Sequence, residues 1–212
     1  MKDNNRKIIL VGGGGHALSL MESLPEDVEI AGYTSLAPSE KINAKWIGDE
    51  CADPSITRLP LPFHIAFIYS GVPRMDKRRA IIERFQISGA RFASLISPLA
   101  TVTPNSVIGD GCALLSGAIV NRATLSSHVV VNTGAIVEHD CVIGENTFIG
   151  PGAVIGGGVT IGKDCFIGLG VKIRNGIRIS SGITVGMGAI VTRDLTEPGI
   201  YHGTPLRFHP FE

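Results

Sequence analysis

The sequence predicts two domains, a small parallel α/β sheet over residues 1–97 and a parallel β-helix over residues 98–212. Two observations carry this prediction. In the first hundred residues, apolar strand patterns alternate with helix patterns. From Val107 to Val191, an aliphatic or small residue recurs at every sixth position. Neither a helix nor simple strand alternation has a six-residue period, so each repeat is expected to place one short strand on a face of a prism.

The N-terminal elements follow the order of a parallel sheet. Strands are expected at residues 7–11, 28–33, 63–71 and 90–96. Helix patterns fill residues 17–24 and 75–89, and the first of them stops at Pro25. Alternation of this kind is typical of a small α/β unit. We expect Ser97 and Pro98 to form the hinge to the repeats.

A glycine turn separates the first strand from the first helix, and it comprises Gly12, Gly13, Gly14, Gly15 and His16. A strand, a glycine turn and a helix start together favour an anion-binding corner, because free backbone N–H groups converge there. A nicotinamide site would also need an acidic residue about 20 positions further on. The chain has Thr34 and Ser35 there. The turn therefore indicates a phosphate-bearing ligand other than a nicotinamide dinucleotide, and a tight turn without a ligand is the alternative.

The repeat domain is predicted to direct two residues of each repeat inward. The first inward set is Val107, Ala113, Ile119, Leu125, Val131, Val137, Ile143, Ile149, Ile155, Ile161, Ile167, Ile173, Ile179, Val185 and Val191. A second small or β-branched residue follows each of these by four positions. Cys141 and Cys165 belong to that second set, so we expect buried free thiols there and neither a disulfide nor a zinc site.

One repeat places a histidine beside a carboxylate. His139 and Asp140 fall on outward positions, and an imidazole with a carboxylate partner is a general-base arrangement. From spacing alone, the alternative is a surface histidine with an acidic neighbour. A three-histidine metal site, of the kind that hydrates carbon dioxide, is not expected. His128 lies 11 residues from His139, whereas stacking on successive coils needs a separation of about 18.

The charge balance excludes several classes of partner. Lys and Arg together number 19, as do Asp and Glu. No net field is therefore expected to recruit nucleic acid or an anionic membrane. No apolar run approaches the roughly 18 residues of a membrane span, and the N-terminus lacks the pattern of a signal peptide. We expect a cytoplasmic protein without nucleic-acid or membrane partners.

Several motifs in the same order resemble the bacterial sugar acyltransferases of the sialic acid O-acetyltransferase and UDP-bacillosamine N-acetyltransferase type. They are Gly-Gly-Gly-His-Ala at 13–17, Asn-Thr-Gly-Ala at 132–135, Glu-His-Asp-Cys-Val-Ile-Gly at 138–144 and Gly-Thr-Pro-Leu-Arg at 203–207. The resemblance implies a Rossmann-like domain that holds a nucleotide-sugar, followed by a left-handed parallel β-helix. It also implies a homotrimer that binds acetyl-CoA between neighbouring β-helices, with no metal.

The resemblance also assigns roles to individual residues. His139 matches the family's general base, and Asp140 matches the acid that raises its basicity. His16 matches a histidine near the phosphates, and Asn132 matches a contact to the acceptor sugar. The pantetheine arm of the donor is expected near Gly157, Leu169 and Met187.

The chain departs from the family at two places. Thr34 and Ser35 stand where an acidic pair usually binds uracil, and Phe148 stands where many members carry a second histidine. We expect Phe148 to be half-exposed near the groove that His139 enters, packed on the thioester arm. The function predicted is acetyl-CoA-dependent acetylation of an amino group on a nucleotide-linked sugar. Sugar O-acetylation and a non-catalytic trimeric binding protein are the alternatives.

Overall fold

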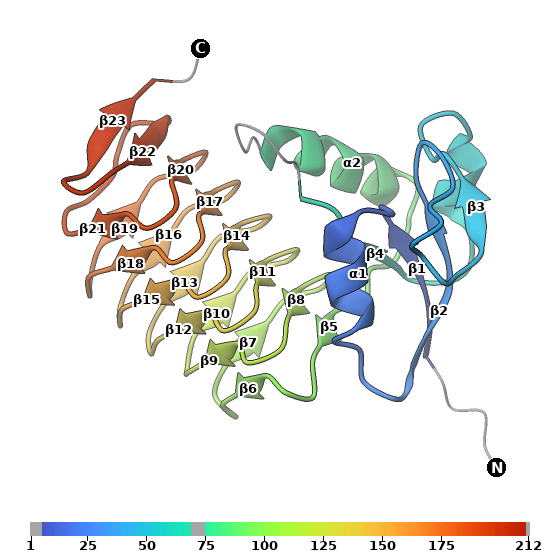
Figure 1. Ribbon diagram of the computed structural model, residues 1–212, viewed down its shortest axis with the longest axis horizontal. Helices are drawn as coiled ribbons and strands as arrows, with labels where there is room; N and C mark the ends of the chain where they lie inside the picture. Colours follow the sequence, from blue (N-terminus) through green and yellow to red (C-terminus); the bar gives the residue numbers. More distant parts are fainter. Residues whose placement is uncertain (1–5, 69–74, 211–212) are drawn as a thin grey trace.

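The computed structural model describes residues 6–68 and 75–210. Its N-terminal part holds one four-stranded sheet of order β3-β2-β1-β4, and all of its strand pairs are parallel. The strands are β1 Arg6–Val11, β2 Val28–Thr34, β3 Trp46–Gly48 and β4 Phe63–Ile65. The helices are α1 Gly15–Met21, the short 3₁₀ helix η1 Pro54–Arg58 and α2 Met75–Ile87. The predicted parallel α/β sheet is confirmed (Figure 1).

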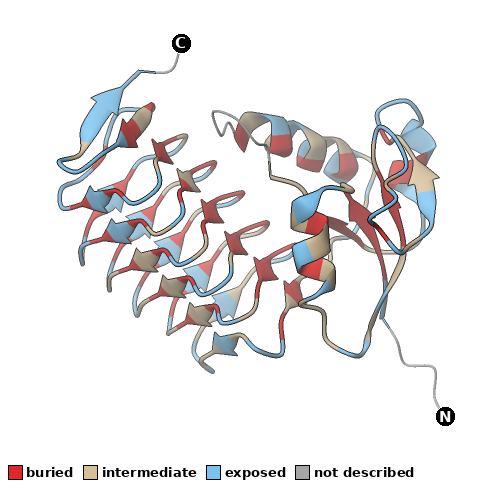
Figure 2. Ribbon diagram, in the orientation of Figure 1, coloured by how far each residue is buried: buried red, intermediate tan, exposed pale blue. Residues whose placement is uncertain are grey.

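Side chains of β1 alternate between two apolar clusters, as a strand covered on both faces requires. Ile8 and Leu10 belong to a cluster with α1. Ile9 and Val11 belong to a second cluster with Ile82 and Phe85 of α2. The buried strands between the helices are visible in Figure 2. Neither α1 nor α2 is long and apolar enough to cross a membrane.

Two expectations for the sheet were wrong. The strand expected over 90–96 is reduced to β5 Leu95–Ile96, which pairs with the β-helix, and Phe92 forms only an isolated bridge with Phe63. The fourth strand is β3, which the periodicity did not indicate because it has only three residues. The strand expected over 63–71 ends at Ile65, and its residues 69–71 lie outside the described residues.

The repeats form a parallel β-helix with three faces, whose strands stack on one another through parallel pairs (Figure 1). The first face contains β5, β8 Ala113–Leu114, β11 Val130–Val131, β14 Phe148–Ile149, β17 Phe166–Ile167 and β20 Thr184–Val185. The second face contains β6 Thr101–Val102, β9 Ile119–Val120, β12 Ile136–Val137, β15 Val154–Ile155, β18 Lys172–Ile173 and β21 Ile190–Val191. The third face contains β7 Val107–Ile108, β10 Thr124–Leu125, β13 Val142–Ile143, β16 Thr160–Ile161 and β19 Arg178–Ile179.

The chain turns from the first face to the second, then to the third, and back to the first. We call the edges between these faces the first, second and third corners in that order. After the last coil, β22 Ile200–His202 extends the first face, and β23 Arg207–His209 pairs with it antiparallel. Cys141 and Cys165 are buried free thiols, as predicted.

The prediction that the six-residue repeat runs without interruption was wrong for the first three repeats. Leu125 pairs with Ile108, 17 residues earlier, whereas it pairs with Ile143, 18 residues later. The turn 121–123 has one residue fewer than the equivalent turns, so the inward residues before it are Ile108, Leu114 and Val120. Val107 is 59% exposed instead. The slip is hidden because both residues of each early strand are aliphatic or small.

The two domains dock through α2 and the third corner. Arg78 is fully buried and donates to the backbone oxygen of His128 at 3.0 Å and to the side-chain oxygen of Asn146. Asn146 donates in turn to Asp164 at 2.8 Å, and Asp164 pairs with Arg79. Asn146 and Asp164 both have positive φ, at 55° and 58°. Asn and Asp tolerate this turn conformation better than other residues with side chains.

Candidate active site

The predicted histidine and carboxylate form a pair at the second corner, on the turn between β12 and β13. Nδ1 of His139 lies 2.8 Å from Oδ2 of Asp140, and both side chains are exposed. The hydrogen bond from His139 lowers the pKa of Asp140, and Arg122 contributes a smaller effect in the same direction. An ionised Asp140 accepts the Nδ1 proton, so Nε2 of the neutral ring is left with its lone pair.

The backbone around this pair comes from three successive coils. Asp140 has φ of 61° and donates its N–H to the backbone oxygen of Arg122 in the coil before. The backbone oxygen of His139 accepts from Gly158 in the coil after, at 2.8 Å. A Cβ added to Gly157 would lie 2.7 Å from Cε1 and Nε2 of His139. Gly157 therefore makes room for the imidazole, so the structure brings these two predicted residues together.

The other residues expected near the donor and acceptor lie at a different edge. Asn132, Leu169 and Met187 all occupy the first corner, between the first and second faces. Leu169 is 57% exposed and Met187 78% exposed. One chain thus carries His139 and Asp140 on one edge of the second face and these three residues on the other.

Phe148 is placed differently from the expectation. Its ring is only 5% exposed, stacks on Phe166 with centroids 4.9 Å apart, and meets His16 edge-on at 6.4 Å. It does point out of the prism, but the first face is covered there by the N-terminal domain. The expected half-exposed position is wrong, because the N-terminal domain covers the ring. Within one chain, β14 and the turn of His139 lie on different sides of the prism.

His16 also departs from its expected place. It lies in the first turn of α1 but packs toward Phe148, and it does not line the cavity at the glycine turn. Burial is the main cause that lowers its pKa to about 3, with smaller effects from Arg78 and His64. Burial likewise lowers the pKa of His64 to about 4 and that of His128 to about 3. These imidazoles are neutral parts of the domain junction.

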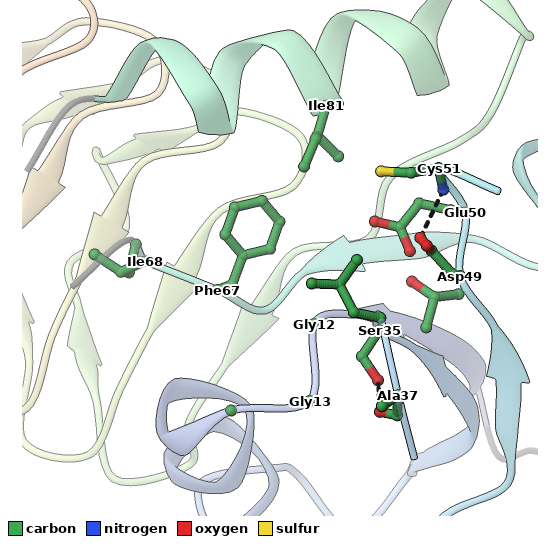
Figure 3. Close-up of a pocket in the computed structure, with 13 residues that line it drawn as sticks. Gly12, Gly13, Ser35, Ala37, Asp49, Glu50, Cys51, Phe67, Ile68 and Ile81 are labelled. Carbon is green, nitrogen blue, oxygen red and sulfur yellow. Dashed lines mark hydrogen bonds between the residues drawn. The ribbon is translucent and has the colours of Figure 1, made fainter. Parts of the chain in front are cut away.

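The glycine turn lines a cavity of about 440 Å³ at the carboxyl ends of the parallel strands (Figure 3). Gly12, Gly13 and Gly14 contribute to its wall, whereas Gly15 does not. Gly12 has φ of 120°, and a Cβ there would lie 3.0 Å from the backbone oxygen of Ala66. Ligands of open α/β sheets bind at this end of the strands. The predicted ligand-binding turn therefore faces a real cavity.

The same cavity contains two carboxylates that the sequence analysis missed. Asp49 and Glu50 follow β3 directly and line the cavity together with Thr34 and Ser35 of β2. A carboxylate oxygen of Asp49, a carboxylate oxygen of Glu50 and the sulfur of Cys51 all lie within 4.8 Å of one another. Acidic side chains thus stand one strand away from the place where the motif comparison sought them. The preceding Trp-Ile-Gly segment is the only sequence signal, and it is too short for a strand pattern.

Comparisons with known proteins agree with this architecture. Models of the bacterial transferase hexapeptide match residues 122–157 and 140–175, and a model of the hexapeptide repeat of succinyl-transferase matches residues 158–193. These matches and the solved structures described below support the resemblance to bacterial hexapeptide-repeat sugar acyltransferases. The resemblance found from the sequence motifs is confirmed.

Solved structures extend the likeness to the N-terminal domain. The acetyltransferase domain of PglB from Neisseria gonorrhoeae FA1090, in complex with acetyl coenzyme A, is 29% identical with a TM-score of 0.86. The match covers 97% of this chain and 100% of that one. PerB from Caulobacter crescentus, in complex with CoA and GDP-perosamine, is 28% identical with a TM-score of 0.85 over 96% of this chain and 97% of that one. WeeI from Acinetobacter baumannii AYE, at 22% identity and a TM-score of 0.78 over 95% and 99%, shares the fold.

Proposed function

We propose that the protein transfers the acetyl group of acetyl-CoA to an amino group of a nucleotide-linked sugar. The hydrogen bond between His139 and Asp140 carries this proposal, because it leaves Nε2 of an exposed imidazole free to accept a proton. Similarity along nearly the whole chain to the PglB acetyltransferase domain and to PerB supports it. With these substrates, a cytoplasmic location follows.

The reaction needs one base and no covalent intermediate. The sugar amine attacks the thioester carbonyl, and Nε2 of His139 accepts the proton that the nitrogen loses. The C–S bond then breaks, an amide forms, and the CoA thiolate leaves and takes up a proton. Asp140 holds the ring and stabilises its protonated form. General-base catalysis of this kind contributes about 10²- to 10⁴-fold in rate.

We assign the cavity at Gly12, Gly13 and Gly14 to the nucleotide, in a Rossmann-like domain. A nucleotide needs a concave site with a few polar groups, and this cavity offers both. Close approach of a ligand to the turn is possible because these three residues have no side chains. The acceptor sugar would then extend from the cavity toward a catalytic pair.

That catalytic pair belongs to a neighbouring protomer of a homotrimer of left-handed β-helices. The N-terminal domain of one protomer contacts its own first face and third corner, whereas His139 lies at the second corner. The exposed Leu169 and Met187 follow one another on successive coils of the first corner, and adjacent exposed apolar side chains are typical of an interface between subunits. A cyclic trimer places the first corner of one β-helix beside the second corner of the next.

Two substitutions test the proposed base. His139→Ala is expected to lower kcat by roughly 10²-fold or more, and Asp140→Asn by less, while both remain folded and bind acetyl-CoA. Activity is measured as CoA release with a panel of amino-sugar nucleotides. Unchanged turnover in His139→Ala would remove the central claim. CoA release with hydroxyl acceptors alone would assign O-acetylation, and binding without any release would assign a non-catalytic role.

A mixing experiment tests the shared site. His139→Ala and the double variant Leu169→Asp, Met187→Asp alter opposite edges of the second face. If each site takes one edge from each of two protomers, co-refolded equimolar mixtures should regain about a quarter of wild-type activity. Light scattering must first show that each parent is a trimer. Recovery of no activity by mixed trimers would place both edges of a site in one protomer.

A further inference from the structure

The buried carboxylate of Glu50 has an oxygen without a partner inside the cavity. Glu50 is only 6% exposed, and its Oε2 is buried without a hydrogen bond. Thr34, also fully buried, has an unpartnered hydroxyl on the same cavity wall. Leaving a buried polar atom unpaired costs about 1–3 kcal/mol, and more for a charged group. An ionised carboxylate can only accept hydrogen bonds, so Oε2 requires a donor from a ligand.

The strand order locates this carboxylate relative to a bound nucleotide. The glycine turn follows β1, Thr34 ends β2, and Glu50 follows β3. Adjacent strands lie about 4.8 Å apart, so Glu50 stands about two strand spacings from the turn. This step rests on the proposed function: with the phosphates at the glycine turn, the ribose lies over the end of β2. The base then reaches the end of β3.

The chemistry of the base edges selects among the nucleotides. Guanine presents two adjacent donors, N1–H and the exocyclic N2 amine, which together match the two oxygens of one carboxylate. Uracil presents a single N3–H between two carbonyl oxygens, which a second carboxylate oxygen would repel. Adenine and cytosine each place an acceptor nitrogen beside their amine. Only guanine satisfies a carboxylate at both oxygens.

The other walls of the cavity fit the same occupant. Asp49 already accepts the N–H of Cys51 at 2.8 Å, so it adds negative charge but is partly engaged. Phe67 and Ile81 face the carboxylates across the cavity and offer apolar surface to the plane of a base (Figure 3). We propose that Glu50 selects guanine by accepting hydrogen bonds from N1–H and the N2 amine, so that the acceptor is a GDP-linked amino sugar.

Binding of four diphosphates to the wild-type protein tests this selection without any acetyl donor. GDP, inosine diphosphate, UDP and ADP are titrated by calorimetry, each with and without EDTA. Inosine diphosphate differs from GDP only in lacking the N2 amine, which makes it the matched ligand. A hydrogen bond to a charged group is worth about 1.5–3 kcal/mol, so GDP should bind roughly 10- to 100-fold more tightly than inosine diphosphate. UDP and ADP should bind more weakly still.

A matched pair of variants assigns the selection to Glu50. Glu50→Gln replaces one acceptor oxygen by an amide NH2 donor, which faces a guanine donor, so GDP affinity should fall at least about 10-fold and the preference over inosine diphosphate should vanish. Glu40→Gln makes the same change at an exposed position outside the cavity and should change neither value. Melting temperatures show whether both variants remain folded. If Glu50→Gln does not fold, the titrations of the wild-type protein still decide whether guanine is selected.

Three results would overturn the proposal. They are UDP or ADP binding as tightly as GDP, equal affinities for GDP and inosine diphosphate, and GDP binding that EDTA abolishes, which would assign the carboxylates to a cation. Failure of the broader function looks different. In that case no nucleotide binds at all and acetyl-CoA is not consumed, whereas a wrong base leaves nucleotide binding and acetyl transfer intact.

Discussion

The imidazole of His139 lies directly over Gly157, whose missing side chain leaves the space that the ring occupies. Gly157→Ala would place a methyl group 2.7 Å from Cε1 and Nε2 of that ring. Because the ring is exposed and can rotate away, the variant should fold normally but hold the base in the wrong place. We expect kcat to fall about 10-fold or more with an unchanged melting temperature.

A double-mutant cycle provides the control for this prediction. In the His139→Ala background, Gly157→Ala should have no further effect on kcat, because the ring it displaces is gone. Additive losses would show that Gly157 acts on the reaction independently of His139.

Phe148 is predicted to be structural. Phe148→His would bury a polar ring in an apolar contact with Phe166 and beside the neutral His16. We expect a loss of about 2–3 kcal/mol in the free energy of unfolding, measured with denaturant, and no change in the KM for acetyl-CoA. Phe166→His is the matched control: its ring is only partly buried, so its loss should be smaller. A stable Phe148→His protein with altered KM would return Phe148 to the donor site.

The neighbouring arginines of α2 should differ in their contribution to domain docking. Arg78→Met leaves the side-chain oxygen of Asn146 and the backbone oxygen of His128 without their donor. Loss of such a buried charged partner costs about 2–4 kcal/mol. Arg79→Met removes a half-exposed ion pair with Asp164 and should cost about 1 kcal/mol or less. Equal losses in chemical unfolding would contradict the buried network.

Acid is predicted to destabilise the domain junction through its neutral histidines. His128 has a pKa of about 3 in the folded protein against 6.5 as its ordinary value, with burial as the main cause. The unfolded chain therefore binds the extra proton below pH 6.5, and stability falls as pH decreases from 6.5 toward 3. Each such histidine contributes a slope of about 1.4 kcal/mol per pH unit.

His128→Asn isolates this contribution, because asparagine tolerates the positive φ of 62° at that position. Unfolding free energies measured between pH 6 and 4.5 should show a slope smaller by about 1.4 kcal/mol per pH unit than that of the wild type. An identical slope in the two proteins would mean that His128 is already protonated when folded.

The regular parts of the molecule were predictable because each strand pair repeats one packing problem. Inward aliphatic residues such as Ile143 and Ile161 must stack on one another, so apolar residues recur in the sequence at a fixed spacing. The shortened turn at 121–123 escaped detection because Ile119 and Val120 satisfy either phase. His139 and Asp140 were found because an imidazole beside a carboxylate is a general-base arrangement and because both residues match the motif of the family that the sequence resembles.

The irregular parts depend on contacts between the domains, which no local pattern records. Phe148 looks like a surface residue of the prism until α1 covers it. The three residues of β3 carry no period, so Asp49 and Glu50 could not be assigned to a strand end. Their place in the cavity follows only from the position of β3 at the edge of the sheet.

The turn conformation at Asn146 and Asp164 has a consequence for engineering this protein. Replacing residues of positive φ with glycine is an obvious way to relieve local strain, and turns such as those at Gly111 and Gly182 already use it. At these two positions the same exchange would remove the side chains that receive Arg78 and Arg79. A variant optimised coil by coil would have less strain in its β-helix turns, but its β-helix would no longer hold the N-terminal domain through Arg78 and Arg79.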